Sequence, residues 1–167
     1  MYPNKYIDGR TQDLIDYIKS CDFSKLKEKQ VWECKNNFDE TEKFEICVCN
    51  KCILKSVRKK NVPAKYDLEF GDLAIEPENK LYYADLKISD KDYSNLPASI
   101  EVRSIIYFRG YYLNFTQARD KLYIIDANKL YEYLWLHNRH LLEGEYIQGS
   151  YIDIIIEFLD NSIVLDI

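Results

Sequence analysis

The chain has 167 residues, a length typical of one compact domain, and its 47% hydrophobic and 31% charged residues are ordinary for a soluble protein. No apolar stretch at the N-terminus resembles a secretion signal and no apolar run could cross a bilayer, so we expect a cytoplasmic protein without membrane contact. The net charge of −5 argues against a nucleic-acid partner unless positive charge gathers locally.

The first predicted element is a helix over residues 10–21. Leu14, Ile15 and Ile18 recur there at helical spacing. Asp13 and Asp16 lie in its early turns, where the helix dipole stabilises carboxylates.

Residues 31–60 are predicted to form an insertion or subdomain with two short strands around a polar turn. Cysteines of a cytosolic protein are more often thiols or metal ligands than disulfides. Four thiolates can bind zinc tetrahedrally, and a pair of cysteines separated by two residues, as at Cys49 and Cys52, is typical of such a site. The four candidates are Cys34, Cys47, Cys49 and Cys52. The alternative is four reduced thiols that pack as small hydrophobic groups.

A basic strip over residues 51–65 carries six positive charges and no acid, so the rest of the chain has a balance of −11. A local strip of this kind can bind phosphates even on an acidic protein, because the position of charge matters more than its sum. The alternative is a solvated loop. The side chains predicted to contact a DNA backbone are Lys55, Arg58, Lys59 and Lys60.

Residues 66–89 are predicted to form an antiparallel hairpin. Apolar and acidic residues alternate over 66–70, Gly71 permits a break, and Asp72 opens the apolar run 73–75. The second strand follows over residues 81–88. Because successive side chains of a strand face opposite ways, Asp85 and Lys87 share one face, and the hairpin can bring Asp72 next to Asp85.

Two neighbouring carboxylates favour a shared hard cation such as Mg²⁺ or Mn²⁺. A bound cation polarises a phosphate and activates water, and a lysine can stabilise the negative charge that develops during cleavage. We therefore predict a metal site of Asp72 and Asp85, with Lys87 as a further catalytic residue, for phosphodiester cleavage. The alternative is a solvent-facing ion pair on a hairpin.

This arrangement resembles the PD-(D/E)xK nuclease superfamily, which includes restriction endonucleases and Holliday-junction resolvases. The family motif is an acid, a gap, and acid-x-Lys on the next strand. Here Asp72 is followed by twelve residues and then by Asp85-Leu86-Lys87, with Gly71 in place of the proline of the family name. The resemblance implies a Mg²⁺-dependent endonuclease acting on DNA, one nuclease-like domain over residues 1–167, and a homodimer for cutting duplex DNA.

The resemblance also implies a core of helix, three strands, helix and strand, and often an additional acid. Asp13, Asp16 and Glu69 are the candidates for that acid, and the sequence does not choose among them. Acid-x-Lys recurs twice more. The copy at Glu78 falls in a turn, whereas the copy at Glu33, with Asp22 eleven residues earlier, is a serious rival to Asp85.

After the hairpin we expect a helix over 97–107, strands over 111–115 and 122–125, and a long helix from Asp126 or Asn128 to about Leu142. Alternating residues over 151–158 predict another strand, and 163–167 the last one. The fold class is therefore α/β (α+β), with a restriction-endonuclease-like three-layer core around a mixed sheet. The C-terminal strand pair offers an edge for a homodimer.

A second function also fits the sequence. A non-catalytic binding protein, such as a phage-type inhibitor or a zinc-stabilised adaptor, would use its acidic surface to bind a basic partner. Asp72, Asp85 and Lys87 would then be ordinary surface charges. A structure separates the two hypotheses, because a nuclease must bring the three side chains together at one cleft.

Overall fold

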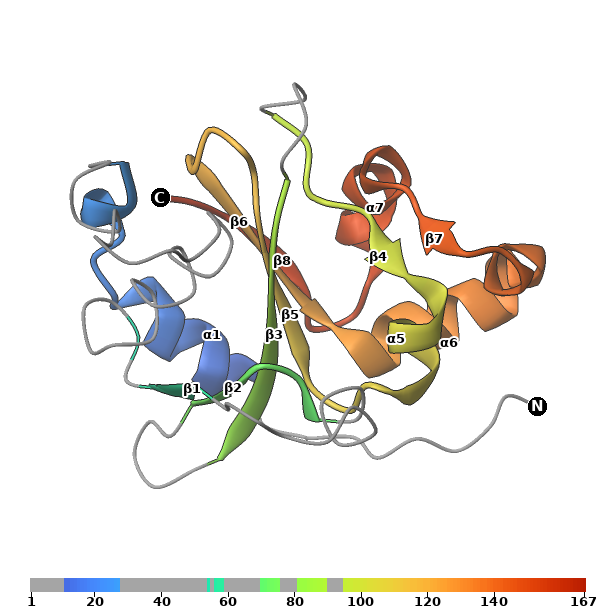
Figure 1. Cartoon of the computed structure of the whole chain (residues 1–167), viewed down its shortest axis with the longest axis horizontal. Helices are drawn as coiled ribbons and strands as arrows, with labels where there is room; N and C mark the ends of the chain where they lie inside the picture. Colours follow the sequence, from blue (N-terminus) through green and yellow to red (C-terminus); the bar gives the residue numbers. More distant parts are fainter. Residues whose placement is uncertain (1–10, 28–53, 55, 59–69, 76–80, 90–94) are drawn as a thin grey trace, which may run out of the picture.

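The computed structural model describes residues 11–27, 54, 56–58, 70–75, 81–89 and 95–167. Its centre is a mixed sheet of six strands in the order β1-β2-β3-β5-β6-β8 (Figure 1). Neighbouring strands are antiparallel except β3 and β5, which are parallel. The strands are β1 (Ser56–Arg58), β2 (Leu73–Ile75), β3 (Tyr82–Ile88), β5 (Tyr111–Phe115), β6 (Lys121–Asp126) and β8 (Ile163–Asp166).

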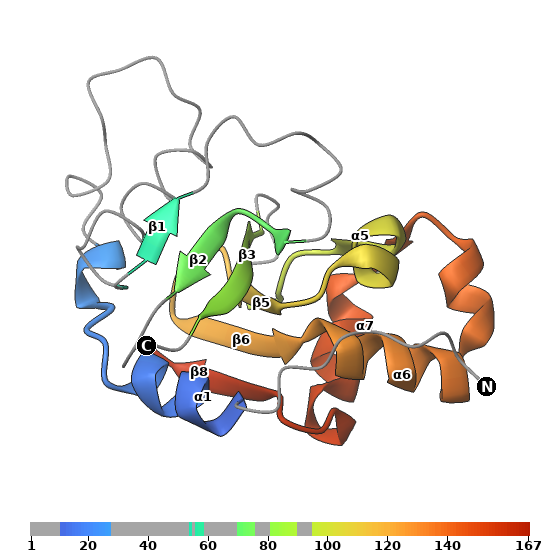
Figure 2. The same cartoon turned by 90° about the horizontal axis from the view of Figure 1, so that it is seen from below.

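Helices cover both faces of this sheet (Figures 1 and 2). One face packs against α1 (Thr11–Lys19), and the other packs against α5 (Val102–Tyr107), α6 (Ala127–His137) and α7 (Gly149–Ile155). Short 3-10 turns extend three of these regions: η1 (Ser24–Lys27), η3 (Arg139–Glu143) and η4 (Ile156–Phe158). The predicted mixed sheet between helices is thus confirmed.

Two separate hydrophobic cores result from the alternation of side chains along the strands. Leu86, Leu113 and Ile124 join the core beneath α1. Their neighbours Tyr112 and Ile125 join the second core, beneath α5 and α6. Each central strand is therefore buried on both faces, as expected for a sheet between two helical layers.

The parallel pair of β3 and β5 requires a crossover, and the chain between them supplies the walls of the candidate site. It runs through residues 95–99 and the short strand β4 (Ile100–Glu101) before α5. β4 pairs with β7 (Tyr146–Ile147), a second short strand that precedes α7. A small two-stranded sheet thus connects the crossover to the C-terminal helices.

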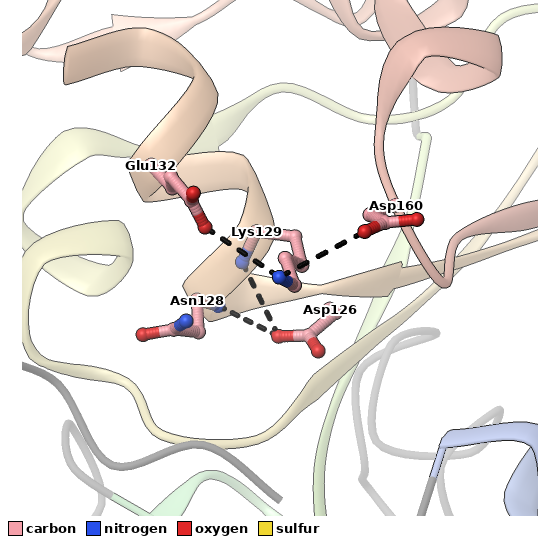
Figure 3. Close-up of polar contacts among 5 residues, drawn as sticks. All are labelled: Asp126, Asn128, Lys129, Glu132 and Asp160. Atoms are coloured by element: carbon pink, nitrogen blue, oxygen red, sulfur yellow. Dashed lines mark hydrogen bonds and ion pairs between the residues drawn. The ribbon is translucent and has the colours of Figure 1, made fainter. Parts of the chain in front are cut away.

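The start of α6 confirms the predicted cap. The Asp126 carboxylate accepts hydrogen bonds from the backbone N–H groups of Asn128 and Lys129, at 2.9 and 3.3 Å (Figure 3). Lys129 then reaches Glu132 on its own helix at 3.6 Å and Asp160 beyond η4 at 4.0 Å. The end of β6 and the segment before β8 are therefore both connected to the first turn of α6.

The strand predicted over 151–158 is wrong, because that segment forms α7 and η4. Ile152, Ile155, Ile156 and Leu159 are buried at helical spacing, whereas Ile154 is 65% exposed. The run of isoleucines satisfies a period of two and a helical period at once. The strand pattern required Ile154 to share a buried face with Ile152 and Ile156, and the structure separates them.

Most other boundaries agree with the sequence. The structure confirms the first helix, the β2–β3 hairpin, the two strands that follow, and the last strand. The helix expected over 97–107 begins only at Val102, and the long helix ends at His137 and continues as η3. Phe70 has helical backbone, and the rest of the strand expected over 66–70 lies outside the described residues. No helix in the described part of the chain is both long and apolar enough for a membrane span.

Candidate active site

An ion pair on β3 is the centre of the site. The Lys87 ammonium lies 3.0 Å from a carboxylate oxygen of Asp85, on the face of the sheet that meets α5 and α6. The residues between and beside them, Ala84 and Leu86, point into the core beneath α1. Asp85 is only 9% exposed, so this pair is not an ordinary surface contact. A buried carboxylate requires a charged or hydrogen-bonding partner, which Lys87 provides.

Asp72 lies immediately before β2, across the hairpin from Asp85. The register pairs Leu73 with Ala84, and its continuation by one residue places Asp72 opposite Asp85. Opposite residues of antiparallel strands have neighbouring side chains on the same face. The charge of Asp72 also acts on Lys87, which places all three residues within electrostatic reach of one another. The structure thus places Asp72 at the strand end opposite Asp85 and within electrostatic reach of Lys87.

Gly71 sets the direction of the backbone into Asp72. Its φ of +72° lies in the left-handed region, which glycine adopts without strain. A Cβ at this position would lie 2.6 Å from the Ala84 carbonyl oxygen on β3. A proline is excluded as well, since its ring fixes φ near −65°. The glycine therefore stands where this backbone requires one.

Glu101 is a functional candidate that the sequence analysis missed. It is the N-cap residue of α5 but makes no side-chain cap hydrogen bond, and it is exposed. Its charge acts on both Lys87 and Tyr112, so it lies on the same side of the sheet as Asp85. Asp13 and Asp16 instead are exposed on α1, whose apolar side covers the opposite face. No local signal singled out Glu101, because it lay inside the helix expected over 97–107, whereas the observed helix begins at Val102.

The three carboxylates determine the charge state of Lys87. Burial alone would lower the pKa of its ammonium, but the attraction of Asp85, followed by Asp72 and Glu101, outweighs burial and raises the pKa above its ordinary value of 10.5. Lys87 is therefore a cation throughout the physiological pH range. It offers a fixed positive charge and not a proton acceptor.

Tyr112 lies beside Asp85 in the parallel register of β3 and β5. Burial, and less strongly the charges of Asp85 and Glu101, raise the pKa of this phenol well above its usual value, against the effect of a hydrogen bond shared with Ser104. The two hydroxyl groups are 2.6 Å apart. Tyr112 therefore stays neutral, and its completely buried ring packs next to Asp85 on the neighbouring strand.

Asn114 occupies the corresponding position beside Lys87. It is completely buried, and its amide group makes two hydrogen bonds to the backbone of Ala98, accepting from the N–H at 2.8 Å and donating to the carbonyl at 2.9 Å. This clamp fixes the segment 95–99 over the end of β3. A cleft of about 700 Å³ opens there, with Lys87 at its edge.

Several predicted residues lie outside the described part of the chain. These are the four cysteines proposed for zinc, the basic residues Lys55, Lys59 and Lys60, and the acids Glu33 and Glu69. Arg58 belongs to β1, so residues 56–58 of the expected insertion form an edge strand of the main sheet. Asp22, the partner considered for Glu33, is exposed and accepts a hydrogen bond from the Ser24 N–H at 2.9 Å.

The donor set is limited but suits magnesium. Within the described ranges, no three histidine, cysteine or acidic side chains gather into a protein cage for a metal. Mg²⁺ needs no such cage, because it commonly binds one or two carboxylates and completes its shell with water and phosphate. Asp72 and Asp85 supply two carboxylates from opposite strands. The residues present therefore fit a hydrated magnesium ion.

Comparisons with known proteins identify no relative: no protein-family model matches the chain, and neither a curated protein nor a solved structure matches it. The functional argument therefore rests on the geometry of this chain.

Proposed function

We propose that the protein is a Mg²⁺-dependent endonuclease of restriction-endonuclease-like fold that cleaves phosphodiester bonds in DNA. The observation that carries this proposal is the half-buried Asp85–Lys87 pair with Asp72 opposite it, at the edge of a cleft. A buried carboxylate paired with a cation is uncommon as a purely structural feature, and a lysine with a shifted pKa at the edge of a cleft favours a functional site. The adaptor hypothesis predicts ordinary surface charges, which the 9% exposure of Asp85 disfavours.

The order of elements supports the same proposal. α1 is followed by β1, β2 and β3, and then by α5 and β5. With η1 and β4 as additions, this order is compatible with the core of helix, three strands, helix and strand that the resemblance to PD-(D/E)xK nucleases implies. Asp72, the first acid of the motif, lies directly before β2, which pairs antiparallel with both β1 and β3. The acid-x-Lys part of the motif lies on β3, the next strand along the chain.

In this proposal each residue has a separate task. Asp72 and Asp85 would hold the magnesium ion, which when bound neutralises phosphate charge and makes water more acidic. Lys87, which stays charged, would stabilise the negative charge that builds up on the phosphate during attack. Glu101, exposed at the start of α5, is the group available to accept a proton from the attacking water.

DNA affinity would come from another part of the chain. Arg58 lies on β1, at the same edge of the sheet as β2 and the site. We propose that it acts with Lys55, Lys59 and Lys60 through phosphate contacts, which weaken as salt rises. Zinc bound by Cys34, Cys47, Cys49 and Cys52 would order this region. A homodimer would use the opposite edge of the sheet, where β8 is the terminal strand.

The test is cleavage of plasmid, linear, branched and single-stranded DNA with Mg²⁺ or Mn²⁺, using wild type, Asp85→Ala and Lys87→Ala. Removing one electrostatic contact of the transition state costs on the order of 10²–10³ in rate. We expect both variants to lose cleavage by that factor or more and to bind DNA nearly as wild type. The matched control is Asp160→Ala, whose carboxylate is 82% exposed and lies before β8, a strand that β5 and β6 separate from β3 in the sheet. Absence of metal-dependent cutting on every substrate would favour the adaptor.

A further inference from the structure

The cleft beside Lys87 has a composition unlike a phosphate-binding groove. Its polar side chains come from three segments that are distant in sequence: the end of β3, the crossover before β4, and the start of α7. They are Ser89, Ser99, Gln148 and Ser150. Lys87 is the one charged side chain among the described residues that line it. Neutral hydroxyl and amide groups of this kind donate and accept hydrogen bonds with the edges of bases and sugars.

Tyr146 adds an aromatic surface to one wall. Tyr146 lines the cleft, and 47% of its surface is exposed to solvent. The register of β4 and β7 places it opposite Glu101. Glu101 in turn acts electrostatically on Lys87. Tyr146 and Lys87 therefore line the same cleft, and the strand neighbour of Tyr146 is within electrostatic reach of Lys87.

The walls of the cleft are held together before any ligand binds. The Asn114 clamp fixes Ala98, and the Ser99 hydroxyl donates to the Gln148 side-chain oxygen at 3.3 Å. Gly149 brings α7 against the crossover, because a Cβ there would lie 1.9 Å from the Pro97 carbonyl oxygen. A site preformed in this way suits a ligand of defined size.

The volume limits what can enter. About 700 Å³ lies in the range that holds one small organic molecule. A continuous duplex cannot place its stacked bases in such a space, but an unpaired nucleotide can. An aromatic side chain offers stacking to any base, and neutral polar groups can contact its edges.

We propose that the cleft binds one unpaired nucleotide, with its base stacked on Tyr146 and its phosphate directed to Lys87. The substrate of the nuclease is then DNA with single-stranded character, such as a free strand, a flap or a loop. This assignment of substrate class rests on the proposed function, whereas nucleotide binding in the cleft does not. The two statements are therefore tested separately.

Binding is measured by the fluorescence of 2-aminopurine in a single-stranded oligodeoxynucleotide, with a fully paired duplex of the same sequence as competitor. Ca²⁺ replaces Mg²⁺ so that binding is observed without cutting. Wild type should quench the probe and prefer the single strand. Loss of one base–aromatic stack in Tyr146→Ala should weaken binding roughly 5- to 150-fold. Tyr146→Phe retains the ring and should retain the affinity and the quenching.

The matched control is Phe158→Ala. Phe158 is an aromatic residue that is 63% exposed on η4 and does not line the cleft, so this variant should bind as wild type. Equal affinity of wild type and Tyr146→Ala, or a preference of wild type for duplex, would overturn the cleft assignment. If wild type and Tyr146→Ala cut continuous duplex equally fast, the proposed substrate class is wrong and the proposed nuclease activity is retained. If no DNA is cut but Tyr146-dependent quenching occurs, the cleft assignment holds and the nuclease fails.

Discussion

The two faces of the central sheet differ in chemistry although they share the same strands. The face toward α1 is apolar: Ala84, Leu86 and Leu113 are fully or almost fully buried in one core. On the face toward α5, the next residues along β3 are Asp85 and Lys87, and β5 contributes a buried Asn114. β3 thus packs apolar side chains into the core beneath α1 and presents polar side chains on its other face.

This difference shows how a small domain can hold charged groups inside. Burying polar groups costs free energy unless they are paired, while apolar burial contributes about 25 cal/mol per Å². Because side chains alternate strictly, each polar residue of β3 is flanked by apolar residues that anchor the strand from the other face. Substitutions on the two faces should therefore have separable effects on stability and on activity.

The largest effect is expected from Leu113→Ala. Leu113 is completely buried beneath α1 and pairs in register with Leu86. Truncation of a buried leucine should lower the free energy of unfolding by about 2–5 kcal/mol, through lost burial and the cavity left behind. Urea denaturation measures the loss. At a temperature where the variant is folded, its DNA cleavage rate should match wild type.

Lys87→Ala supplies the reciprocal result: cleavage is lost, while the urea midpoint falls less than in Leu113→Ala, because the variant removes only a partly exposed partner of Asp85 and leaves the apolar core intact. The separation of the two faces fails if Leu113→Ala abolishes cleavage while the protein is still folded. It fails equally if Lys87→Ala unfolds the chain.

A smaller effect is expected from Gly71→Ala, at the residue that directly precedes Asp72 and lies close to the backbone of β3. The alanine would have to adopt a φ of +72° and approach the Ala84 carbonyl closely. Backbone strain of this kind costs about 1–3 kcal/mol. Relief of the strain should move Asp72 away from Asp85, so the cleavage rate should fall together with the thermal midpoint.

Gly144→Ala is the matched control for Gly71→Ala. Its φ of −83° is ordinary, and a Cβ there would meet its nearest neighbour, the Leu141 carbonyl oxygen, only at 3.4 Å. We expect little change in either measurement. Equal effects of the two glycine substitutions would show that Gly71 has no special role in placing Asp72.

The smallest effect concerns pH. The pKa of Lys87 is raised in the folded protein, because attraction to Asp85, Asp72 and Glu101 outweighs its burial. The stabilisation from its charge should therefore be complete below about pH 10.5, the ordinary value expected in the unfolded state, and should disappear as pH rises through the folded-state value. The difference in unfolding free energy between wild type and Lys87→Met should be constant from neutral pH to about pH 9.5 and change only above that. A change centred near neutral pH would mean that the carboxylates do not hold the proton on Lys87.

The sequence predicted those parts of the site that depend on local pattern. Alternation along 82–88 placed Asp85 and Lys87 on one face, and turn residues between two apolar runs predicted the hairpin that brings Asp72 close. Glu101 escaped prediction because its position depends on how far the crossover extends before α5 begins. α7 was mistaken for a strand because consecutive isoleucines fit both periods, and only packing against the second core decides between them.

The cleft could not have been inferred from sequence at all. Its walls come from residues 87–89, 96–99 and 146–150, and nothing in the local pattern of any of them indicates the others. Their proximity depends on the pairing of β4 with β7 and on the contact of Gly149 with Pro97. Such contacts between distant segments are fixed by tertiary packing.

The amide of Asn114 has a consequence for the thermodynamics of ligand binding. A crossover segment without regular structure would ordinarily keep conformational freedom, and ordering it around a ligand costs roughly 1–2 kcal/mol for each residue fixed. Two hydrogen bonds from one buried side chain remove that freedom around Ala98 during folding. The entropy of ordering this wall has then been lost before a ligand arrives, so more of the contact energy can appear as affinity.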